Sequence, residues 1–370
     1  MLKTNSISKA DSSFLDFARG ISAQLVLIGH LLSMYGVYKA YPYLPKIQNF
    51  GVMIFFIMSG FLITFISIVK GRQYGFKNFI VDRFSRIYSA FIPALVLIFF
   101  IDLYLSTIQV KDYESFNHSF GNFVSNLFLL QNHPFLMTLF HTTSYGSARI
   151  LWTVSIEWMF YICFGILFYW GSLMKKPNAI KIAMGLFFLV VPIFYISGRG
   201  DGLTLYWLLG LVLALLYFNS VKIFNEKYLN YFLLFAVIAF LYRLVFSKIF
   251  EMYESGLALI LFTLFYIIFS LNAKESSFSK RILSKTKTFN SFLASYSYSL
   301  YLVHYSLIYL LFSFFEKYNL LVALVLNVII INIISFVFYY CFERNYFKVR
   351  VKIKNVLDFS NRKTGKLENE

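Results

Sequence analysis

The sequence predicts an all-α integral membrane protein with about ten transmembrane helices and both termini in the cytoplasm. Three observations predict this class: a very apolar composition, recurrent apolar stretches of membrane-spanning length, and basic residues that gather on alternate loops. Of the 370 residues, 59% are hydrophobic and only 14% are charged, whereas a soluble domain carries about 25% charged residues. A soluble or disordered protein is therefore excluded, and the two cysteines, Cys163 and Cys341, lie in apolar runs that exclude a disulfide scaffold.

Apolar stretches of about 20 residues are long enough to cross the bilayer core as helices. In chain order they cover residues 13–35, 50–69, 88–106, 150–170, 180–197, 203–219, 229–247, 256–271, 292–315 and 320–341. No internal repeat and no low-complexity linker divides them, which predicts one membrane domain over residues 1–341. Residues 342–370 are basic and then polar, which predicts a cytoplasmic tail.

The distribution of basic residues predicts the orientation of these spans. With the N-terminus inside, 26 of the 34 Lys and Arg fall on inside loops, inner helix ends and the tail, and seven fall outside. The remaining one, Arg243, lies within a span. Because Lys and Arg accumulate on the cytoplasmic side, this excess predicts that both termini lie inside and that the number of spans is even. The net charge of +17 then reflects loop asymmetry and does not indicate a nucleic-acid partner.

Ionisable side chains within the spans are the first candidates for function, because a charge at mid-bilayer costs about 2.5–3.5 kcal/mol on insertion scales. The candidates are Asp16, Arg19, His30, Asp102, Glu157, Arg243 and His304. Arg19 and His30 are separated by about three helical turns, so they share one helix face about 16 Å apart along the axis. A neutral imidazole can accept a proton near neutral pH. The alternative is a buried histidine satisfied by a neighbouring helix.

Glu157 falls in a helix of the opposite direction and at the same predicted depth as His30. A carboxylate at that depth needs a partner, and an imidazole N–H is a suitable one because the carboxylate would orient the ring and raise its basicity. The alternative is a structural pair of Glu157 with Arg149 or with a hydroxyl group.

Arg83 and Arg86 occupy positions i and i+3 at the cytoplasmic entry of the third span. Their fork-shaped guanidinium groups suit bidentate binding of phosphate. The alternative is an ordinary positively charged inside loop.

Five segments occur in a characteristic order along the chain. They are LDFARGI at 15–21 followed by His30, FGVMIFFIMSGFLI at 50–63, RFSRI at 83–87, LWTVSIE at 151–157 and SYSLYLVH at 297–304. Together they resemble the membrane-bound acyltransferase-3 family, whose members move acyl groups, most often acetyl, onto hydroxyls of cell-surface glycans and some small molecules. The departures are small: Ala18 replaces the usual leucine, Trp158 replaces a frequent second acid, and Ile87-Tyr88 lacks a proline often found there.

The resemblance implies an O-acyltransferase, most often an O-acetyltransferase, in the plasma (inner) membrane of a bacterium. It implies that His30 is the catalytic base supported by Glu157, and that Arg19, Arg83 and Arg86 contact the phosphates of an acyl-CoA donor such as acetyl-CoA. The implied partners are acyl-CoA, a cell-surface or lipid-linked saccharide acceptor and membrane lipid, with no metal and no nucleic acid. Direct transfer and an acyl-histidine intermediate are both consistent with these residues.

Several alternatives stay open at the level of sequence. The rival function is a membrane transporter or exporter of a glycan, for which paired broken helices are expected and none is found by inspection. Ser59 is a packing residue or, less simply, a nucleophile. His304 and Tyr301 line a cavity or fill the packing, and Asp102 and Arg243 pair with each other or bind sugar.

Overall fold

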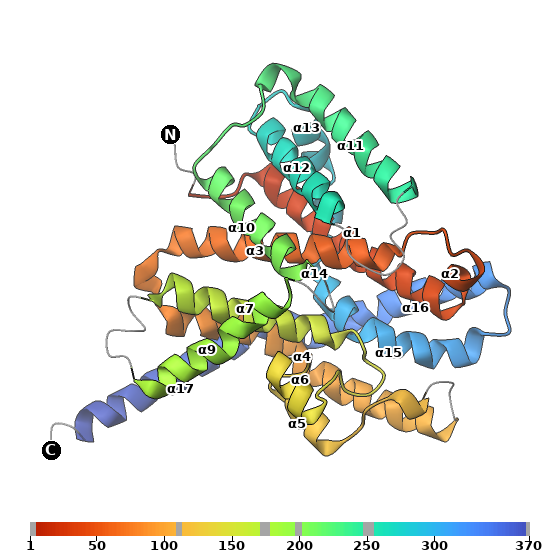
Figure 1. The fold of residues 1–370 in the computed structure, drawn as a ribbon, viewed down its shortest axis with the longest axis vertical. Coiled ribbons are helices and arrows are strands. Elements are labelled where there is room, and N and C mark those ends of the chain that lie inside the picture. The colour runs from red at the N-terminus through yellow and green to blue at the C-terminus, as the bar shows by residue number, and fades with distance from the viewer. Residues whose placement is uncertain (1–4, 109–112, 171–177, 197–201, 247–254, 368–370) are drawn as a thin grey trace. The chain divides into compact units, whose positions relative to one another are not determined.

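The computed structural model describes residues 5–108, 113–170, 178–196, 202–246 and 255–367, which form helices and turns and include no strand (Figure 1). Within this part of the chain, eight helices are long and apolar enough to cross a membrane. Two shorter apolar helices, α9 (Ala179–Phe194) and α10 (Leu203–Phe218), correspond to the other two predicted spans. An all-helical protein with eight to ten apolar helices is therefore confirmed, and the orientation of its termini stays a prediction.

The helices belong to two compact units. The first unit comprises Met1–Gly71, Leu189–Tyr301 and Leu311–Ile330, and the second comprises Arg72–Phe188, Leu302–Leu310 and Ile331–Glu370. The first contains α1 (Lys9–Met34), α2 (Val37–Ala40), α3 (Ile47–Lys70), α10, η3 (Glu226–Tyr228), α11 (Leu229–Phe246), α12 (Ser255–Asn272), α13 (Phe278–Lys285) and α14 (Lys287–Ser295). The second contains η1 (Arg72–Tyr74), α4 (Phe76–Thr107), η2 (Tyr113–Ser115), α5 (Phe120–Leu127), α6 (Pro134–Phe140), α7 (Leu151–Phe168), η4 (Glu343–Asn345) and α17 (Tyr346–Leu367). Helices α9, α15 (Ser297–Phe315) and α16 (Leu320–Cys341) contribute residues to both units.

In the first unit, a buried aspartate fixes the start of α1. The Ser8 side chain caps the helix by accepting a hydrogen bond from the backbone N–H of Asp11 at 3.0 Å. The Asp11 carboxylate in turn accepts hydrogen bonds from the Ser8 hydroxyl at 2.6 Å, the Tyr217 hydroxyl at 2.9 Å and the Asn272 amide at 2.8 Å. Both oxygens of this carboxylate are therefore satisfied, and the network ties α1 to the ends of α10 and α12.

Glycines set the close packing of α3 in the first unit. A Cβ at Gly60 would lie 2.0 Å from the Trp207 carbonyl oxygen of α10, and a Cβ at Gly210 would lie 1.9 Å from the Ile57 carbonyl oxygen of α3. On the other side of α3, a Cβ at Gly51 would lie 2.5 Å from the Ser22 carbonyl oxygen of α1. Small residues thus let the three helices approach closely, as expected for helices in a membrane.

The second unit differs from the sequence prediction at α4. The predicted span began at residue 88, whereas α4 begins at Phe76, directly after Gly75 with a φ of +77°. The extra turns intersperse the charged residues Lys77, Asp82, Arg83 and Arg86 among apolar ones, so a search for apolar runs does not detect them although the helix is continuous. The apolar residues of these turns are Phe76, Phe79, Ile80, Val81, Phe84 and Ile87.

Two further boundaries differ from the prediction. The predicted span 292–315 is divided into α14 and α15 at Tyr296. The hydroxyls of Ser295 and Ser297, which flank the break, donate to the carbonyl oxygens of Phe292 and Ala294. Such local bonds compete with the helical pattern. Residues of the predicted tail form α17, which packs on α4 in the second unit.

Candidate functional site

Arg19 and His30 both lie on α1, which is one continuous helix in the first unit. Arg19 lies 3.7 Å from the Asp16 carboxylate, one turn away on the same helix, and the two side chains are about one quarter exposed, at 25% and 23%. The turn that carries His30 is fixed against α3, because a Cβ at Gly29 would lie 2.6 Å from the backbone nitrogen of Gln48. The structure thus holds the imidazole on a close-packed helix, with its side chain partly buried.

Arg83 and Arg86 lie near the N-terminal end of α4 in the second unit, and both are partly buried. The Arg83 guanidinium lies over the Phe79 ring at 5.8 Å, and the Arg86 guanidinium lies over the Tyr346 ring of α17 at 5.5 Å. Arg83 Nε is buried and makes no hydrogen bond, and neither guanidinium forms an ion pair with any described residue. Buried cations usually have anionic partners, so this pair is suited to an anionic ligand.

The carboxylate next to this arginine pair is bound by another residue. Asp82 Oδ1 lies 2.6 Å from Arg350 Nε of α17, and the Asp82 side chain is 10% exposed. The Tyr74 hydroxyl donates to Asp82 as well, and Arg350 donates to the Tyr74 hydroxyl oxygen at 3.1 Å. Arg350 therefore neutralises the acid that would otherwise compete for Arg83 and Arg86.

Glu157 lies in α7, in the second unit, and accepts a hydrogen bond from the Tyr161 hydroxyl one turn further along the same helix. The hydroxyl partner is one of the two structural pairings that the sequence left open. The other pairing was with Arg149, whose side chain donates instead to the Ser115 hydroxyl and lies over the Phe116 ring at 5.8 Å. Tyr161 is buried and Glu157 is partly buried.

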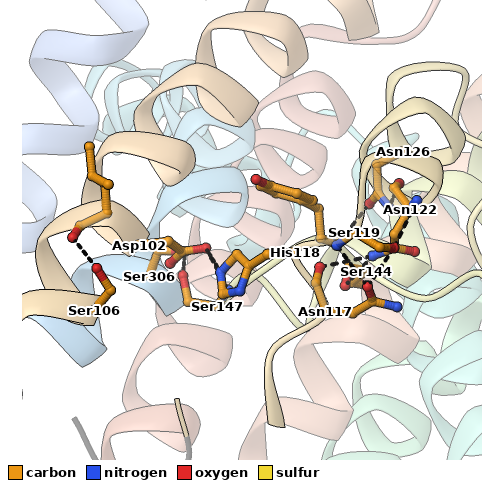
Figure 2. Close-up of polar contacts among 12 residues, drawn as sticks. Asp102, Ser106, Asn117, His118, Ser119, Asn122, Asn126, Ser144, Ser147 and Ser306 are labelled. Carbon is orange, nitrogen blue, oxygen red and sulfur yellow. Dashed lines mark hydrogen bonds and ion pairs between the residues drawn. The ribbon is translucent and has the colours of Figure 1, made fainter. Parts of the chain in front are cut away.

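A second polar cluster in the second unit surrounds Asp102 at the C-terminal end of α4 (Figure 2). Asp102 Oδ2 accepts a hydrogen bond from the Ser147 backbone N–H at 3.0 Å and lies 3.1 Å from His118 Nε2. The Ser147 hydroxyl donates to the Ser306 hydroxyl oxygen of α15 at 2.6 Å. Sequence reasoning noted Asp102 as an acid within a span and did not connect it with His118, because no local pattern joins an acid to a histidine 16 residues later.

The remaining candidates are packing residues or stay open. Ser59 precedes Gly60 at the close α3–α10 contact and is 8% exposed, which supports its packing role. Tyr301 packs edge to face on Phe55, with ring centroids 5.6 Å apart. His304 is fully buried in α15.

Comparison with known proteins identifies the family. The profile of a family described as an acyltransferase domain matches residues 12–342. The chain belongs to this acyltransferase-3 family. The resemblance inferred from the five sequence motifs is thereby confirmed. In this acyltransferase the matched region ends directly before η4 and α17.

Three relatives illustrate what this acyltransferase is similar to. It is 30% identical to an O-acetyl transferase of Shigella phage Sf6 over 161 residues, which cover 42% of this chain and 45% of the relative. It is 26% identical over 295 residues to a provisionally named O-acetyltransferase of Staphylococcus aureus (strain COL), covering 72% of this chain and 47% of the relative. It is 28% identical over 148 residues to the peptidoglycan O-acetyltransferase of Listeria monocytogenes serovar 1/2a, covering 37% of this chain and 22% of the relative. The matched regions thus cover less than half of each of these relatives, and no solved structure matches the chain significantly.

The predicted site residues of this acyltransferase are shared between its two units. The first unit holds Arg19 and His30 on α1, and the second holds Arg83 and Arg86 together on α4 and Glu157 on α7. A pairing of His30 with Glu157 involves both units and stays a prediction. Sequence reasoning missed the role of Arg350, although the spacing of Tyr346, Arg350 and Lys354 by four residues was a usable signal for one helix face.

Proposed function

We propose that this protein is a membrane O-acetyltransferase that moves an acetyl group from cytosolic acetyl-CoA to a hydroxyl of a cell-surface or lipid-linked glycan. The observation that carries the proposal is the family match over residues 12–342, together with relatives named as O-acetyltransferases, one of them a peptidoglycan O-acetyltransferase. The eight long apolar helices support a multi-pass protein, which we place in the bacterial plasma (inner) membrane.

The proposed orientation follows from charge. Both termini lie in the cytoplasm, because 26 of the 34 Lys and Arg then face it. In this orientation the arginines of α4 lie toward the cytosol, where acyl-CoA is made, and Asp102 lies toward the outer surface. The donor and the acceptor then arrive from opposite faces of the membrane.

The donor phosphates bind to Arg83 and Arg86, with Arg19 as a further contact. The partly buried position of the pair and the lack of a carboxylate partner among the described residues support this role, because guanidinium groups bind phosphate oxygens in a bidentate manner. Arg19 is the weaker candidate of the three, since Asp16 lies 3.7 Å from it and offsets part of its charge.

His30 accepts the proton of the acceptor hydroxyl while the hydroxyl oxygen bonds to the thioester carbonyl carbon. The carbon–sulfur bond then breaks, CoA leaves as the thiolate, and the proton held by His30 neutralises it. Glu157 stabilises the imidazolium that forms. In the variant of this scheme with an acyl-histidine intermediate, the imidazole carries the acetyl group before the hydroxyl takes it.

The test uses purified protein in nanodiscs and acetyl-CoA labelled on its acetyl group. We expect the wild type to bind the donor and to release CoA or pass on the label, and we expect His30→Ala to bind the donor with unchanged Kd and to lose at least about 100-fold in turnover. His141→Asn is the matched control, because His141 is an exposed histidine with a left-handed backbone that asparagine tolerates. Retained turnover in His30→Ala would end its role as the base, and folded wild type without donor binding would favour the exporter.

A further inference from the structure

Buried asparagine side chains fix the loop around Asp102 by several hydrogen bonds to its backbone. The Asn122 side chain donates to the carbonyl oxygens of Asn117 and Ser144 at 3.2 and 3.3 Å and accepts from the Thr143 N–H at 2.9 Å. The Asn126 side chain donates to the Thr143 carbonyl oxygen at 2.7 Å and accepts from the Tyr145 N–H at 3.0 Å. These two buried asparagines therefore hold the segment that carries His118 against the segment that carries Ser147, as Figure 2 shows.

The backbone approaches Asp102 where only glycine fits. Gly146 has a φ of +56°, and a Cβ added there would lie 1.8 Å from Asp102 Oδ2. The next residue, Ser147, donates its backbone N–H to the same oxygen. The carboxylate is thus held by a loop whose conformation is fixed at this point.

Only one of the two carboxylate oxygens of Asp102 has a hydrogen-bond partner among the described residues, in contrast to Asp11. Asp102 is 2% exposed, and its Oδ1 atom is buried without a hydrogen-bond partner among the described residues. Asp11, equally buried, has partners for both oxygens. A buried acceptor without a partner costs free energy, and the described residues hold the Asp102 carboxylate by one oxygen only, the oxygen that faces His118.

His118 is the accessible member of the cluster. Its side chain is 28% exposed, and its ring stacks on Tyr113 with centroids 5.1 Å apart and contacts the edge of Tyr145 at 5.7 Å. With Nε2 donating to the Asp102 carboxylate, Nδ1 carries the lone pair, and the ring makes no other hydrogen bond with the described residues. A fixed imidazole with one free acceptor beside an aromatic face has the composition of a site for a polar, hydroxyl-bearing ligand.

We propose that Asp102 and His118 form a binding site for the acceptor, in which His118 Nδ1 accepts a hydrogen bond from an acceptor hydroxyl and Tyr113 covers the ligand beside it. The inference rests on the proposed function, because it deepens the O-acetyltransferase reaction by naming where the saccharide binds. Asp102 is a positioning residue: it sets the tautomer and the orientation of the ring and does not touch the acceptor.

The test varies the acceptor concentration. Envelope polysaccharide, extracted from a strain that lacks this gene and de-esterified with mild base, is supplied by mass to protein in nanodiscs with labelled acetyl-CoA. We expect His118→Ala and His118→Gln to raise the apparent acceptor KM about 10-fold and to leave the Kd for CoA within about two-fold. His118→Gln is the informative variant, because its amide N–H can still donate to Asp102 while Nδ1 is lost. His141→Asn is the control and keeps the wild-type KM.

Each outcome decides the inference. If His118→Gln keeps the wild-type acceptor KM, the histidine only stabilises the loop. If the Kd for CoA rises as much as the acceptor KM, the histidine belongs to the donor site. Either result overturns the acceptor site. Asp102→Asn is expected to raise the acceptor KM as well, by less than the His118 variants do. Wild type that binds CoA and transfers no label to any polysaccharide would refute the proposed function itself and the acceptor site with it.

Discussion

Helix α4 carries Arg83 and Arg86 near its N-terminal end and Asp102 near its C-terminal end, and the partners of these charged groups differ between the two ends. The arginines contact aromatic rings and have no carboxylate partner among the described residues, whereas Asp102 is held by a backbone N–H and by an imidazole. The difference agrees with our proposal that the first end binds the phosphates of the donor. The second is preorganised to hold one histidine in place.

The largest expected effect is at the arginine end. We expect Arg83→Ala with Arg86→Ala to raise the Kd for CoA by about 10- to 100-fold, because each removes charge-assisted hydrogen bonds to phosphate. Binding is measured with labelled CoA in nanodiscs. Lys77→Ala is the control, since Lys77 is an exposed cation on the same helix. Equal and small effects of both changes would show that the arginines only help to set the orientation of the helix in the membrane.

The next effect tests the rigidity of the Asp102 end. Gly146→Ala is expected to lower the free energy of unfolding by about 2 kcal/mol or more, because alanine disfavours a positive φ and its Cβ would displace the Asp102 carboxylate. Thermal unfolding of the purified protein measures the change. Gly121→Ala, in α5 with open space around the added Cβ, is expected to be neutral or stabilising. Similar Tm values for the two variants would contradict the rigid end.

A smaller effect concerns the acid beside the arginines. Arg350→Ala leaves the Asp82 carboxylate free to attract Arg83, so we expect the Kd for CoA to rise by about three- to ten-fold. Adding Asp82→Asn should restore binding, because it removes the competing charge. Lys352→Ala is the control, since it removes one exposed cation from the same helix. Arg350→Ala without effect on CoA binding, or without rescue, would show that α17 does not tune the arginine end.

The smallest expected effect is the pH dependence of stability that comes from His133, in the segment after α4. Burial lowers the pKa of His133 below its ordinary value of 6.5, and its Nε2 donates to the Phe187 carbonyl oxygen at 2.9 Å. A depressed folded-state pKa means that the unfolded state binds more protons, so the stabilisation is full above about pH 6.5 and declines as the pH falls below it. We expect a loss of less than about 1 kcal/mol between pH 7.5 and 6, and a flat profile for His133→Gln. A Tm that falls equally in both proteins would exclude His133 as the cause.

Much of the fold could be predicted from the sequence because the bilayer imposes long apolar helices. The first turns of α4 were missed because Lys77, Asp82, Arg83 and Arg86 lower the mean hydropathy of residues 76–87 without breaking the helix, which begins at Phe76. The division at Tyr296 escaped as well, since flanking serines that bond to nearby carbonyl oxygens do not change the apolar content.

The candidate site was predictable only where its residues lie in local patterns. Arg19 with His30, and Arg83 with Arg86, share single helices, so spacing alone relates them. The Asp102–His118 pair depends on a loop folded back by Asn122 and Asn126, and the Asp82–Arg350 pair joins residues far apart in the chain. Spacing could place Arg350 on one helix face, but such contacts arise from tertiary structure, and no local pattern identifies the partner.

One measurement tests most directly whether the two ends of α4 serve different substrates. The Kd for CoA and the apparent KM for de-esterified envelope polysaccharide are determined for wild type, Arg86→Ala, His118→Gln and the double variant. We predict that Arg86→Ala raises only the Kd for CoA, that His118→Gln raises only the acceptor KM, and that the double variant combines both effects additively, as expected for independent sites. If both single variants shift the same parameter, the assignment of donor and acceptor to opposite ends of α4 is contradicted.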